Sequence, residues 1–440
     1  MIDTQTKSIL TELLNFSLTR KLKLFVVGGT LRDHLLHKNI GDIDLAGKNA
    51  AELGTKFAQS LSFNYVSLDK TEGRATTRII LPTQQYFDLT DMQGDRIEED
   101  LIKRDFTINA MGQELSHFLD TKETILDLCE SKEDLKKKII RTTSNSVFKA
   151  DPLRMLRAFR LAATLNFSIS QEVLNDISLH KNNISLAAGE RIWSELVAFF
   201  KAEKIFKLVN LIERSGLFSC LFPVVFKDWD KVLNQFQRLE NLISNPAIYF
   251  PKHTPRITNP ELLKLSLLLN EIEINSLTEQ SGKNDFGNPK TYEALKTLKA
   301  SNNEITFICK SIQNLHFLGN SLSCSKNDSY LYDLCLEGGE QLIEGLLLHA
   351  STLSITSESE IIASDRLKPH SNLLEFYFTR YLPILGEKAL LNGNDIIKKF
   401  NIAPSPTVGE VLKDIQRAQV LGEIKTSAEA EKLAAKILNS

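Results

Sequence analysis

The sequence predicts an α+β protein, in which a head with a mixed sheet and helices is followed by a mostly α-helical remainder. In roughly the first 130 residues, short β-rich runs alternate with helical patterns. The β-rich runs are Lys23–Val27, Ala75–Leu81 and Tyr86–Leu89. After about Asn145 the apolar residues recur at helical spacing as far as the C-terminus. We therefore expect the sheet to be confined to the head.

The chain is long enough for several domains. Single hydrophobic cores rarely grow beyond about 300 residues, and the chain has 440. Proline and glycine residues mark breaks near Pro223, from Pro246 to Pro255, from Gly282 to Pro289 and at Gly338-Gly339. We predict a head over residues 1–145, a helical neck over 146–225, a helical body over 226–380 and a helical tail over 381–440.

The composition is that of a globular protein, with 42% hydrophobic and 25% charged residues. No signal peptide and no run of about 20 apolar residues is visible, so we expect a cytoplasmic protein without a membrane segment. The cysteines form no CxxC pair, which favours reduced thiols over disulfides or a zinc site. They are Cys129, Cys220, Cys309, Cys324 and Cys335. With a net charge of −2, any basic surface for nucleic acid must be local, and residues 132–160 are one candidate.

A glycine pair and an acidic pair lie close together in the first third of the chain. The β-rich run that ends at Val27 leads into Gly28 and Gly29 and then into a helical pattern. Such a turn lets backbone N–H groups approach a phosphate, which the N-terminus of a helix also favours. The alternative is an ordinary connecting turn.

Asp42 and Asp44 are alternate residues, which point to the same side of a strand. Two neighbouring carboxylates need a cation, and Mg²⁺ binds carboxylates together with substrate phosphates. Two such ions can activate a hydroxyl and stabilise a leaving pyrophosphate. We expect Asp88 to be the third carboxylate, with Asp91 as its competitor. Solvated acids in a polar turn are the alternative.

A second run of polar residues extends from Asp100 to Met111. Arg104 can hold phosphate or sugar oxygens through two parallel hydrogen bonds, and Asn109 can bond to a ribose hydroxyl. Asp105 either orients Arg104 or caps a helix. The apolar residues of this run, Phe106, Ile108 and Met111, are expected in the core.

A third run opens a helix at Asp151, which we expect to be the N-cap, with Pro152 in the first turn. Helical spacing places Arg154, Arg157 and Arg160 on one face of this helix. The apolar residues Leu153, Leu156 and Phe159 lie towards another face. The arginines can attract phosphates, and a carboxylate and a guanidinium one turn apart can also pair with the edge of a base.

In order and spacing, these runs resemble the motifs of the class II tRNA nucleotidyltransferase and poly(A) polymerase family, part of the polymerase β-like superfamily. Residues 28–44 resemble its metal and triphosphate motif, and residues 103–110 its ribose-selecting motif. Residues 151–154 resemble its amino-acid template, in which Asp and Arg read the incoming base. Residues 189–196 are similar to the helix-stabilising motif that follows, and residues 391–430 resemble, more faintly, the tail of bacterial members.

The resemblance implies a template-independent enzyme that adds C, A or both from CTP and ATP to the 3′ end of a tRNA and releases pyrophosphate. Mg²⁺ is the implied cofactor, and tRNA with ATP or CTP are the implied partners. The metal ligands would be Asp42 and Asp44, acting in catalysis with Asp88. The nucleotide-binding residues would be Gly28, Gly29, Arg32, Arg104, Asn109, Asp151, Arg154 and Arg157.

Four features depart from the family pattern. Lys103 stands where an arginine is usual, and a lysine cannot make the arginine's paired hydrogen bonds. Ala150 stands where many members have a glutamate. The span between Asp88 and Arg104 is short, where CCA-adding members carry a longer flexible loop that helps the switch from C to A. Asn270-Glu271 occupies the place of the His-Asp pair of a phosphohydrolase in some relatives, so we expect helical scaffold there.

Two other functions stay open on the sequence alone. A poly(A) polymerase of the same family has similar motifs, and a non-catalytic RNA-binding scaffold would keep the basic surfaces without the chemistry. Whether CCA, CC, A or poly(A) is added is open, and the sequence does not define an oligomeric state.

Overall fold

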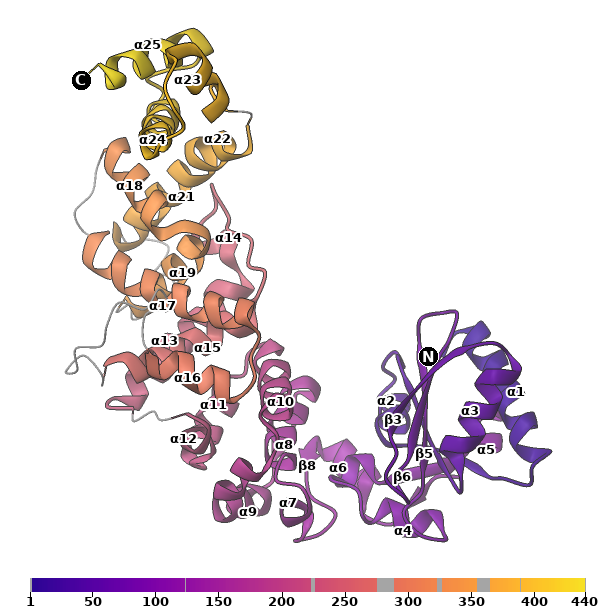
Figure 1. Cartoon of the computed structure of the whole chain (residues 1–440). Helices are drawn as coiled ribbons and strands as arrows, with labels where there is room; N and C mark the ends of the chain where they lie inside the picture. The colour runs from indigo at the N-terminus through magenta and orange to yellow at the C-terminus, as the bar shows by residue number, and fades with distance from the viewer. Residues whose placement is uncertain are drawn as a thin grey trace. The chain divides into compact units, whose positions relative to one another are not determined.

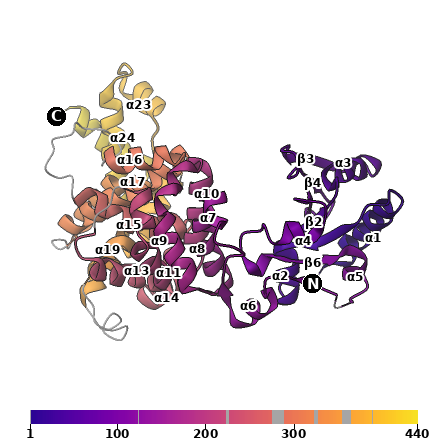
Figure 2. The same cartoon turned by 90° about the horizontal axis from the view of Figure 1, so that it is seen from below.

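A computed structural model of the chain describes residues 2–122, 124–222, 226–274, 289–322, 327–353, 365–387 and 389–439. Pro223, Gly282 and Cys324, which we singled out in the sequence, lie outside the described residues. The chain forms two compact units (Figures 1 and 2). Unit 1 comprises residues 1–199 and 208–221, and unit 2 comprises residues 200–207 and 222–440. The finer division into head, neck, body and tail stays a prediction.

The head of unit 1 contains a seven-stranded sheet, with strands in the order β3-β4-β5-β2-β1-β6-β7. The strands are β1 Leu24–Val27, β2 Ile43–Gly47, β3 Asn64–Asp69, β4 Thr76–Ile80, β5 Tyr86–Asp91, β6 Met111–Glu114 and β7 Leu126–Asp127. Only β2 and β5 are parallel neighbours, and the other pairs are antiparallel. The predicted mixed sheet is confirmed, and the three predicted β-rich runs are β1, β4 and β5.

The two faces of this sheet differ because strand side chains alternate between them. One face carries apolar side chains such as Leu45, Phe87 and Leu89, all fully buried. Helices α1 (Thr4–Leu18) and α3 (Ala50–Ser60) lie together on one side of the sheet, with α2 (Gly28–Leu35) on the other (Figure 1). The polar side chains of β2 and β5 therefore collect on the face opposite the apolar core.

The remaining elements of unit 1 are mostly helical. They are α4 Ile97–Leu101, a 3₁₀ turn Thr107–Asn109, α5 Leu115–Leu119, α6 Ser131–Lys137, β8 Ile139–Ile140, α7 Val147–Ala150, α8 Arg154–Leu165, β9 Ser168–Ile169, α9 Gln171–His180, a 3₁₀ turn Lys181–Leu186, α10 Gly189–Lys201, α11 Phe206–Arg214 and α12 Leu217–Leu221. Strands β8 and β9 pair in parallel, which the helical pattern after residue 145 did not predict. The predicted apolar face of α8 is confirmed, because Leu156 and Phe159 are buried.

Unit 2 is helical wherever regular structure is described. Its helices are α13 Trp229–Ser244, α14 Pro246–Tyr249, α15 Pro260–Ile274, α16 Pro289–Thr297, α17 Asn302–Ser321, α18 Asp328–Gly338, α19 Leu342–Thr352, α21 Lys368–Phe376, α22 Leu382–Gly386, α23 Gly393–Phe400, α24 Pro406–Val420 and α25 Ser427–Leu438. Short 3₁₀ turns occur at Gly339–Gln341 and Asp365–Leu367, and a π-helical turn at Tyr377–Tyr381 precedes α22. The predicted break at Gly338-Gly339 is confirmed, because α18 ends there with a positive φ at Gly339. No helix within the described ranges is long and apolar enough to cross a bilayer.

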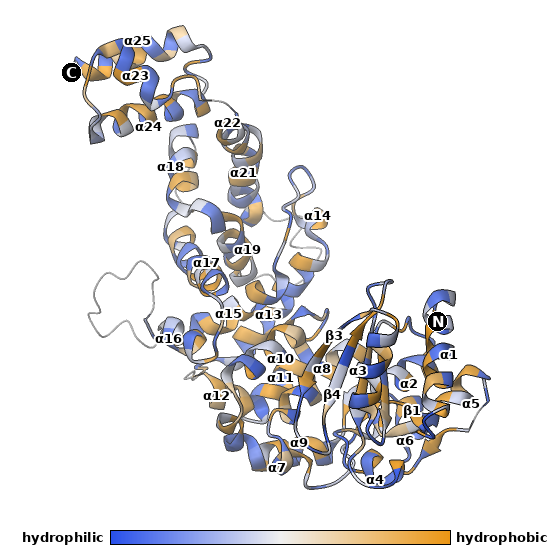
Figure 3. Ribbon diagram, turned by 45° about the vertical axis from the view of Figure 1, so that its right-hand side comes forward, coloured by the Kyte–Doolittle hydropathy of each residue, from blue (hydrophilic) through white to orange (hydrophobic). Residues whose placement is uncertain are grey.

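Close packing of α17 against α19 depends on a glycine. A Cβ at Gly345 would lie 2.2 Å from the Cβ of Asn314, so only glycine allows this approach. Hydrophobic and hydrophilic residues alternate around these helices (Figure 3). Helices α23 to α25 have a separate apolar cluster, which includes Ile396, Val411 and Ala430. The faint resemblance of residues 391–430 thus falls on a segment with its own small core.

Two buried polar pairs lie inside unit 2. Lys264 and Glu240 form an ion pair at 3.0 Å with side chains only 3% and 4% exposed. Glu240 also accepts from the backbone N–H groups of Ile205 and Phe206, at 3.0 Å each. His349 and His370 stack, with Nδ1 of the first 2.9 Å from Nε2 of the second. Helix α15 contains Asn270 and Glu271, as the expected scaffold role requires.

Candidate active site

Three polar side chains form a row across strands β2, β5 and β4, on the face of the sheet opposite the apolar core. Asp44 pairs in register with Asp88, and Asp88 pairs in register with Arg78. Arg78 donates Nε to Oδ1 of Asp88 at 2.8 Å and Nη2 to Oδ2 at 2.7 Å. The two carboxylates therefore lie side by side, although they are far apart in the sequence.

Asp42 lies one residue before β2 and is exposed to solvent. The Thr30 hydroxyl donates to the backbone carbonyl of Asp42 at 3.2 Å and accepts from the backbone N–H of Asp44 at 2.7 Å. This double contact ties α2 to the acidic segment. The competitor Asp91 is directed elsewhere, because its carboxylate accepts from the backbone N–H of Ala51 at the start of α3, at 2.9 Å.

The environment of Asp44 is unusual for a carboxylate. Burial raises the pKa of Asp44 to about 6, the nearby Arg104 opposes this, and the negative charges of Asp88 and Asp42 add to the rise. A cation beside these acids would stabilise the ionised form and reverse the shift. Hard oxygen ligands of this kind suit a divalent ion such as Mg²⁺. In the residues described, no group of three or more His, Cys, Asp or Glu side chains is arranged to hold a metal ion, so the metal site at Asp42 and Asp44 stays a prediction.

Gly28 opens α2 directly under Asp44 and Arg104. Its φ is +65°, and a Cβ there would lie 3.0 Å from Nη1 of Arg104 and 3.2 Å from Oδ2 of Asp44. A larger residue at this position would be strained and would displace one of these groups. The glycines are thus the first residues of the helix, rather than a turn before it, and they bring the helix N-terminus to the carboxylate row.

Two arginines are fixed beside this helix N-terminus. Asp100 accepts from Nε and Nη2 of Arg104 at 3.1 and 2.9 Å, which leaves Nη1 facing Gly28. Arg32 donates Nη1 to Oδ1 of Asn109 at 2.8 Å and pairs with Asp33 through Nε and Nη2. The structure therefore brings together Gly28, Asp44, Arg104, Arg32 and Asn109, five of the predicted site residues.

Asp105 does not orient Arg104, as we considered possible from the sequence. It is 8% exposed and accepts from Nε and Nη2 of Arg157 at 3.0 and 2.8 Å and from Nδ2 of Asn109 at 3.1 Å. Asp105 also accepts from the backbone N–H of Phe106 at 2.8 Å, immediately before the 3₁₀ turn Thr107–Asn109. The sequence suggested the neighbouring Arg104 as the partner of Asp105, but in the fold the arginine that binds Asp105 is Arg157 of α8.

Arg157 is consequently enclosed by acids. Its Nη1 lies 3.6 Å from Oε1 of Glu195 on α10, and Glu195 also accepts from Nε of Arg160 at 2.6 Å. The arginine face predicted on α8 exists, but two of its three members are used in ion pairs. A direct contact of Arg157 with a nucleotide stays a prediction.

Asp151 is not the N-cap of α8, because the regular helix begins three residues later, at Arg154. Pro152 and Leu153 form a turn, in which Oδ1 of Asp151 accepts from the backbone N–H of Leu153 at 3.1 Å. Oδ2 of Asp151 accepts from Arg191 of α10 at 3.0 Å. Arg154 makes no ion pair with any residue that the structure describes. One carboxylate held in place and one uncommitted guanidinium thus lie at the start of α8.

Two residues of this site, Asp100 and Arg78, were not among those predicted from the sequence. Asp100 precedes Arg104 by four residues, and this spacing of opposite charges on a helix was a visible signal. Arg78 gave no local signal, since its pairing with Asp88 depends on the register of β4 and β5. Lys103, the departure from the family pattern, is exposed and donates to the backbone carbonyl of Gln93 at 3.0 Å.

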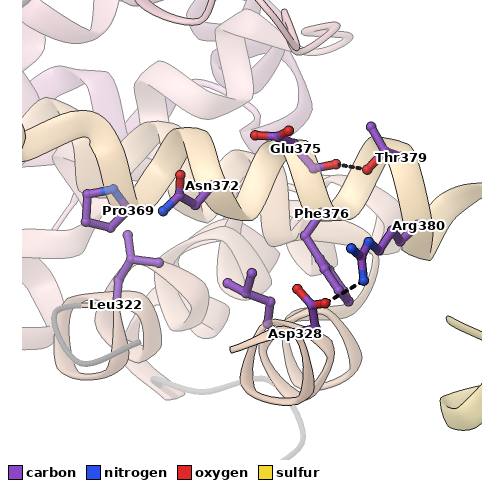
Figure 4. Close-up of a pocket in the computed structure, with 9 residues that line it drawn as sticks. Leu322, Asp328, Pro369, Asn372, Glu375, Phe376, Thr379 and Arg380 are labelled. Carbon is purple, nitrogen blue, oxygen red and sulfur yellow. Dashed lines mark hydrogen bonds and ion pairs between the residues drawn. The ribbon is translucent and has the colours of Figure 1, made fainter. Parts of the chain in front are cut away.

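Two cavities in unit 2 do not contain the predicted site. One of about 360 Å³ is lined by residues of α17, α18, α21 and the π-helical turn, with Arg380 paired to Asp328 (Figure 4). The other, of about 390 Å³, is lined by residues of α17 and the Gly338-Gly339 break. Neither cavity is lined by a predicted site residue.

Sequence families match most of the chain. Residues 24–141 match the family described as "Poly A polymerase head domain". Residues 166–228 match "Probable RNA and SrmB- binding site of polymerase A", and residues 286–433 match a tRNA nucleotidyltransferase domain 2 family. The mixed sheet, with its acidic row beside the glycine-led helix, thus lies in the segment that matches a poly(A) polymerase head, and helices follow it.

Known proteins resemble the chain over nearly its whole length. A CC-adding tRNA nucleotidyltransferase of Geobacter sulfurreducens is 27% identical, covering 93% of this chain and 91% of that protein. A CCA-adding enzyme of Enterococcus faecalis is also 27% identical, covering 92% and 89%. Residues 24–141, 166–228 and 286–433 therefore belong to poly(A) polymerase and tRNA nucleotidyltransferase domain families.

Solved structures share the fold. A CCA-adding enzyme in complex with ATP has a TM-score of 0.73 at 21% identity, covering 99% of this chain and 94% of that one. The CCA-adding enzyme of Thermotoga maritima in complex with a tRNA has a TM-score of 0.71 at 22% identity, covering 100% and 96%. The predicted fold class is confirmed.

Proposed function

We propose that this protein is a tRNA nucleotidyltransferase, which adds cytidines from CTP to the 3′ end of a tRNA and releases pyrophosphate. The observation that carries this function is the row of Asp44 and Asp88 beside the glycine-led helix α2. The tRNA nucleotidyltransferase family match over residues 286–433 supports tRNA as the acceptor. One relative named above is a CC-adding tRNA nucleotidyltransferase and the other a CCA-adding enzyme, which favours this function over poly(A) synthesis.

The phosphate side of the site would be formed by α2 and two arginines. The N-terminus of α2 offers backbone N–H groups and the positive end of the helix dipole to a triphosphate. Arg104 keeps Nη1 uncommitted next to Gly28, so it can donate to a phosphate without breaking its pair with Asp100. Arg32 and Asn109, already bonded to each other, would hold the sugar and the phosphates in a fixed geometry.

Asp42 and Asp44 would hold the divalent ion that members of this family generally use, which we propose to be Mg²⁺. Such an ion lowers the pKa of an attacking hydroxyl and neutralises charge on a leaving pyrophosphate. The neighbouring carboxylates of Asp44 and Asp88 support a cation site, and burial, which raises the pKa of Asp44 against the opposing charge of Arg104, agrees with a need for further positive charge. Thr30 bonds to the backbone of both acidic residues, which holds this stretch of backbone against α2.

The base would be selected by Asp151 and Arg154. Cytosine and adenine each present an amino donor next to a ring nitrogen acceptor, whereas uracil and guanine present a carbonyl next to an N–H group. A carboxylate and a guanidinium side by side complement the first pattern and repel the second. Arg191 fixes the carboxylate of Asp151, and Arg154 has no competing ion pair within the described residues.

The product is proposed to end at CC. Only residues 92–96 connect β5 to α4, which leaves no room for the longer loop that we associate with the switch from C to A. The Geobacter relative is a CC-adding enzyme, and the Enterococcus relative is a CCA-adding enzyme, so the wider family includes both products. The final A would then come from a second enzyme. The cytoplasmic location expected from the sequence stays a prediction.

The test uses tRNA transcripts that end before CCA, after C and after CC, each incubated with CTP, ATP or both in the presence of Mg²⁺. We expect two C additions to the first transcript, one to the second and none to the third, with products resolved by mass. Addition of A to the transcript that ends in CC would show a CCA-adding enzyme instead. Long A tails on unrelated RNA would favour the poly(A) polymerase. No incorporation with intact tRNA binding would favour the non-catalytic scaffold.

A further inference from the structure

Arg78 is a cation built into the proposed metal site. It lies in register with Asp88, which lies in register with Asp44, so a single row holds one guanidinium and two carboxylates. Its contacts with Asp88 are two parallel hydrogen bonds of 2.7 and 2.8 Å, the strongest geometry for this type of pair. Neither the role of Asp42 and Asp44 nor that of Asp88 requires such a residue.

The position of Arg78 is fixed from a second side. Its guanidinium carbon lies 4.8 Å from the centre of the Tyr86 ring, which is a cation–π distance. The side chain of Asp88 is 15% exposed and that of Arg78 is 33% exposed. The pair is therefore mostly covered by protein, and it is screened by solvent less than a surface pair would be.

The pairing has two effects on a cation that approaches Asp88. Both carboxylate oxygens already accept from Arg78, and a ligand that is committed to a guanidinium is a poorer ligand for a metal ion. The positive charge of Arg78 also repels a second cation at short range. We propose that Arg78 is a resident counter-ion of Asp88, which competes with a divalent ion and weakens metal binding by the nucleotide-free protein.

This inference rests on the proposed metal site at Asp42 and Asp44. A purely structural role for Arg78, as a strand-to-strand staple, would leave metal affinity unchanged or lower when the arginine is removed. A competing role predicts the opposite sign. The sign of the change in metal affinity therefore separates the two roles, without any measurement of nucleotide addition.

The experiment measures Mn²⁺ binding to the full-length, nucleotide-free protein at neutral pH, from the electron paramagnetic resonance signal of free Mn²⁺. We expect Arg78→Gln to bind Mn²⁺ about tenfold more tightly than the wild type, since a unit charge near the ion is removed from a half-buried site. Arg74→Gln is the matched control, because Arg74 is exposed on the same hairpin and its loss changes the net charge equally. Its Mn²⁺ affinity should equal that of the wild type.

Three further variants make the result decisive. Arg78→Lys keeps the charge but loses the paired hydrogen bonds, so we expect a smaller gain in affinity, and this variant stands in if Arg78→Gln does not fold. Arg78→Gln with Asp88→Asn should lose the gain, because the gain depends on a freed Asp88. Unchanged or weaker binding by a folded Arg78→Gln variant overturns the proposal, as does a gain that survives Asp88→Asn. If Asp44→Asn leaves Mn²⁺ binding unaltered, the proposed metal site itself is wrong.

Discussion

Replacing Asp105 by asparagine tests whether the contacts between the head sheet region and α8 hold the nucleotide site together. The carboxylate of Asp105 accepts four hydrogen bonds, two from Arg157, one from Asn109 and one from the backbone of Phe106. An asparagine offers one acceptor oxygen, and its amino group meets donors instead of acceptors. Asn109, which bonds to Arg32, would lose a fixed partner in the same step.

The magnitude follows from the burial of the pair. Breaking a fully buried ion pair by removing one partner costs about 3–5 kcal/mol. The side chain of Arg157 is 35% exposed and keeps Glu195 at 3.6 Å, so solvent and a second acid recover part of this cost. We therefore expect the free energy of unfolding of unit 1 to fall by roughly 2–3 kcal/mol, which is below the range for a fully buried pair because of screening. Because Asn109 and Arg32 lose a fixed position, we also expect kcat/KM for CTP to fall by about tenfold or more.

The assay combines urea unfolding with steady-state C addition to a tRNA. Asp120→Asn is the control, since Asp120 pairs with Lys122 in an exposed position and its loss should cost less than about 0.5 kcal/mol. Unfolding of Asp105→Asn within 0.5 kcal/mol of the wild type would refute the energetic reasoning. A destabilised variant with unchanged kcat/KM for CTP would refute the coupling of this contact to the nucleotide site.

The same pair sets a pH dependence. Burial works against the ionised carboxyl of Asp105, but Arg157 and the hydrogen bond from Asn109 outweigh it, so the pKa of Asp105 lies below its usual value. A carboxyl with a lowered folded pKa stabilises the fold above its unfolded pKa of about 4 and loses that contribution as the pH falls further. The stability difference between the wild type and Asp105→Asn should therefore be constant near neutral pH and shrink only in strong acid.

Three other changes should have separable effects. Asp42→Ala should abolish nucleotide addition while unfolding and tRNA binding stay near wild type, and full activity of this variant would contradict the metal role. In His370, burial and then the neighbouring His349 lower the pKa to about 3, so stability should fall by about 2 kcal/mol between neutral pH and pH 5, where the unfolded imidazole is protonated. His370→Phe should remove most of that slope in thermal melts. Glu240→Gln leaves the charge of Lys264 buried without its acidic partner and should cost about 3–5 kcal/mol in urea unfolding. Glu240→Leu combined with Lys264→Met should recover only part of this cost, because the backbone N–H groups of Ile205 and Phe206 lose their acceptor.

Local patterns in the sequence were sufficient for several parts of the site. The alternation in the Tyr86 run predicted a strand with Asp88 on its polar side, and that strand is β5. The spacing of Asp42 and Asp44 predicted two carboxylates side by side on a strand, but only Asp44 lies within β2, so their pairing stays a prediction. The glycine pair after an apolar strand predicted the start of a helix, which is α2, and its binding of phosphate stays a prediction. Each of these predictions uses residues that are neighbours in the chain, for which period and propensity carry the information.

The predictions that failed or were missed depend on contacts between distant segments. Asp105 is 52 residues from Arg157 in the chain, and no local pattern indicates that pair. Asp151 looks like an N-cap, but its two partners, the backbone of Leu153 and the side chain of Arg191, hold it in a turn before α8. The sequence singled out both aspartates, but the arginine that binds each of them could be identified only from the fold.

Because β2 and β5 pair in parallel, the acidic row depends on the register of β5 but not on the length of the segment that follows Asp91. Adding or removing one residue within β5 between Phe87 and Leu89 would put one of the neighbouring side chains on the wrong face of the sheet, since side-chain direction reverses with every residue. Insertions after Asp91 would leave the two acids adjacent whatever their length. Evolution or a protein engineer can therefore lengthen the segment that follows β5 and leave the acidic row intact, while the strand that carries Asp88 must keep its register.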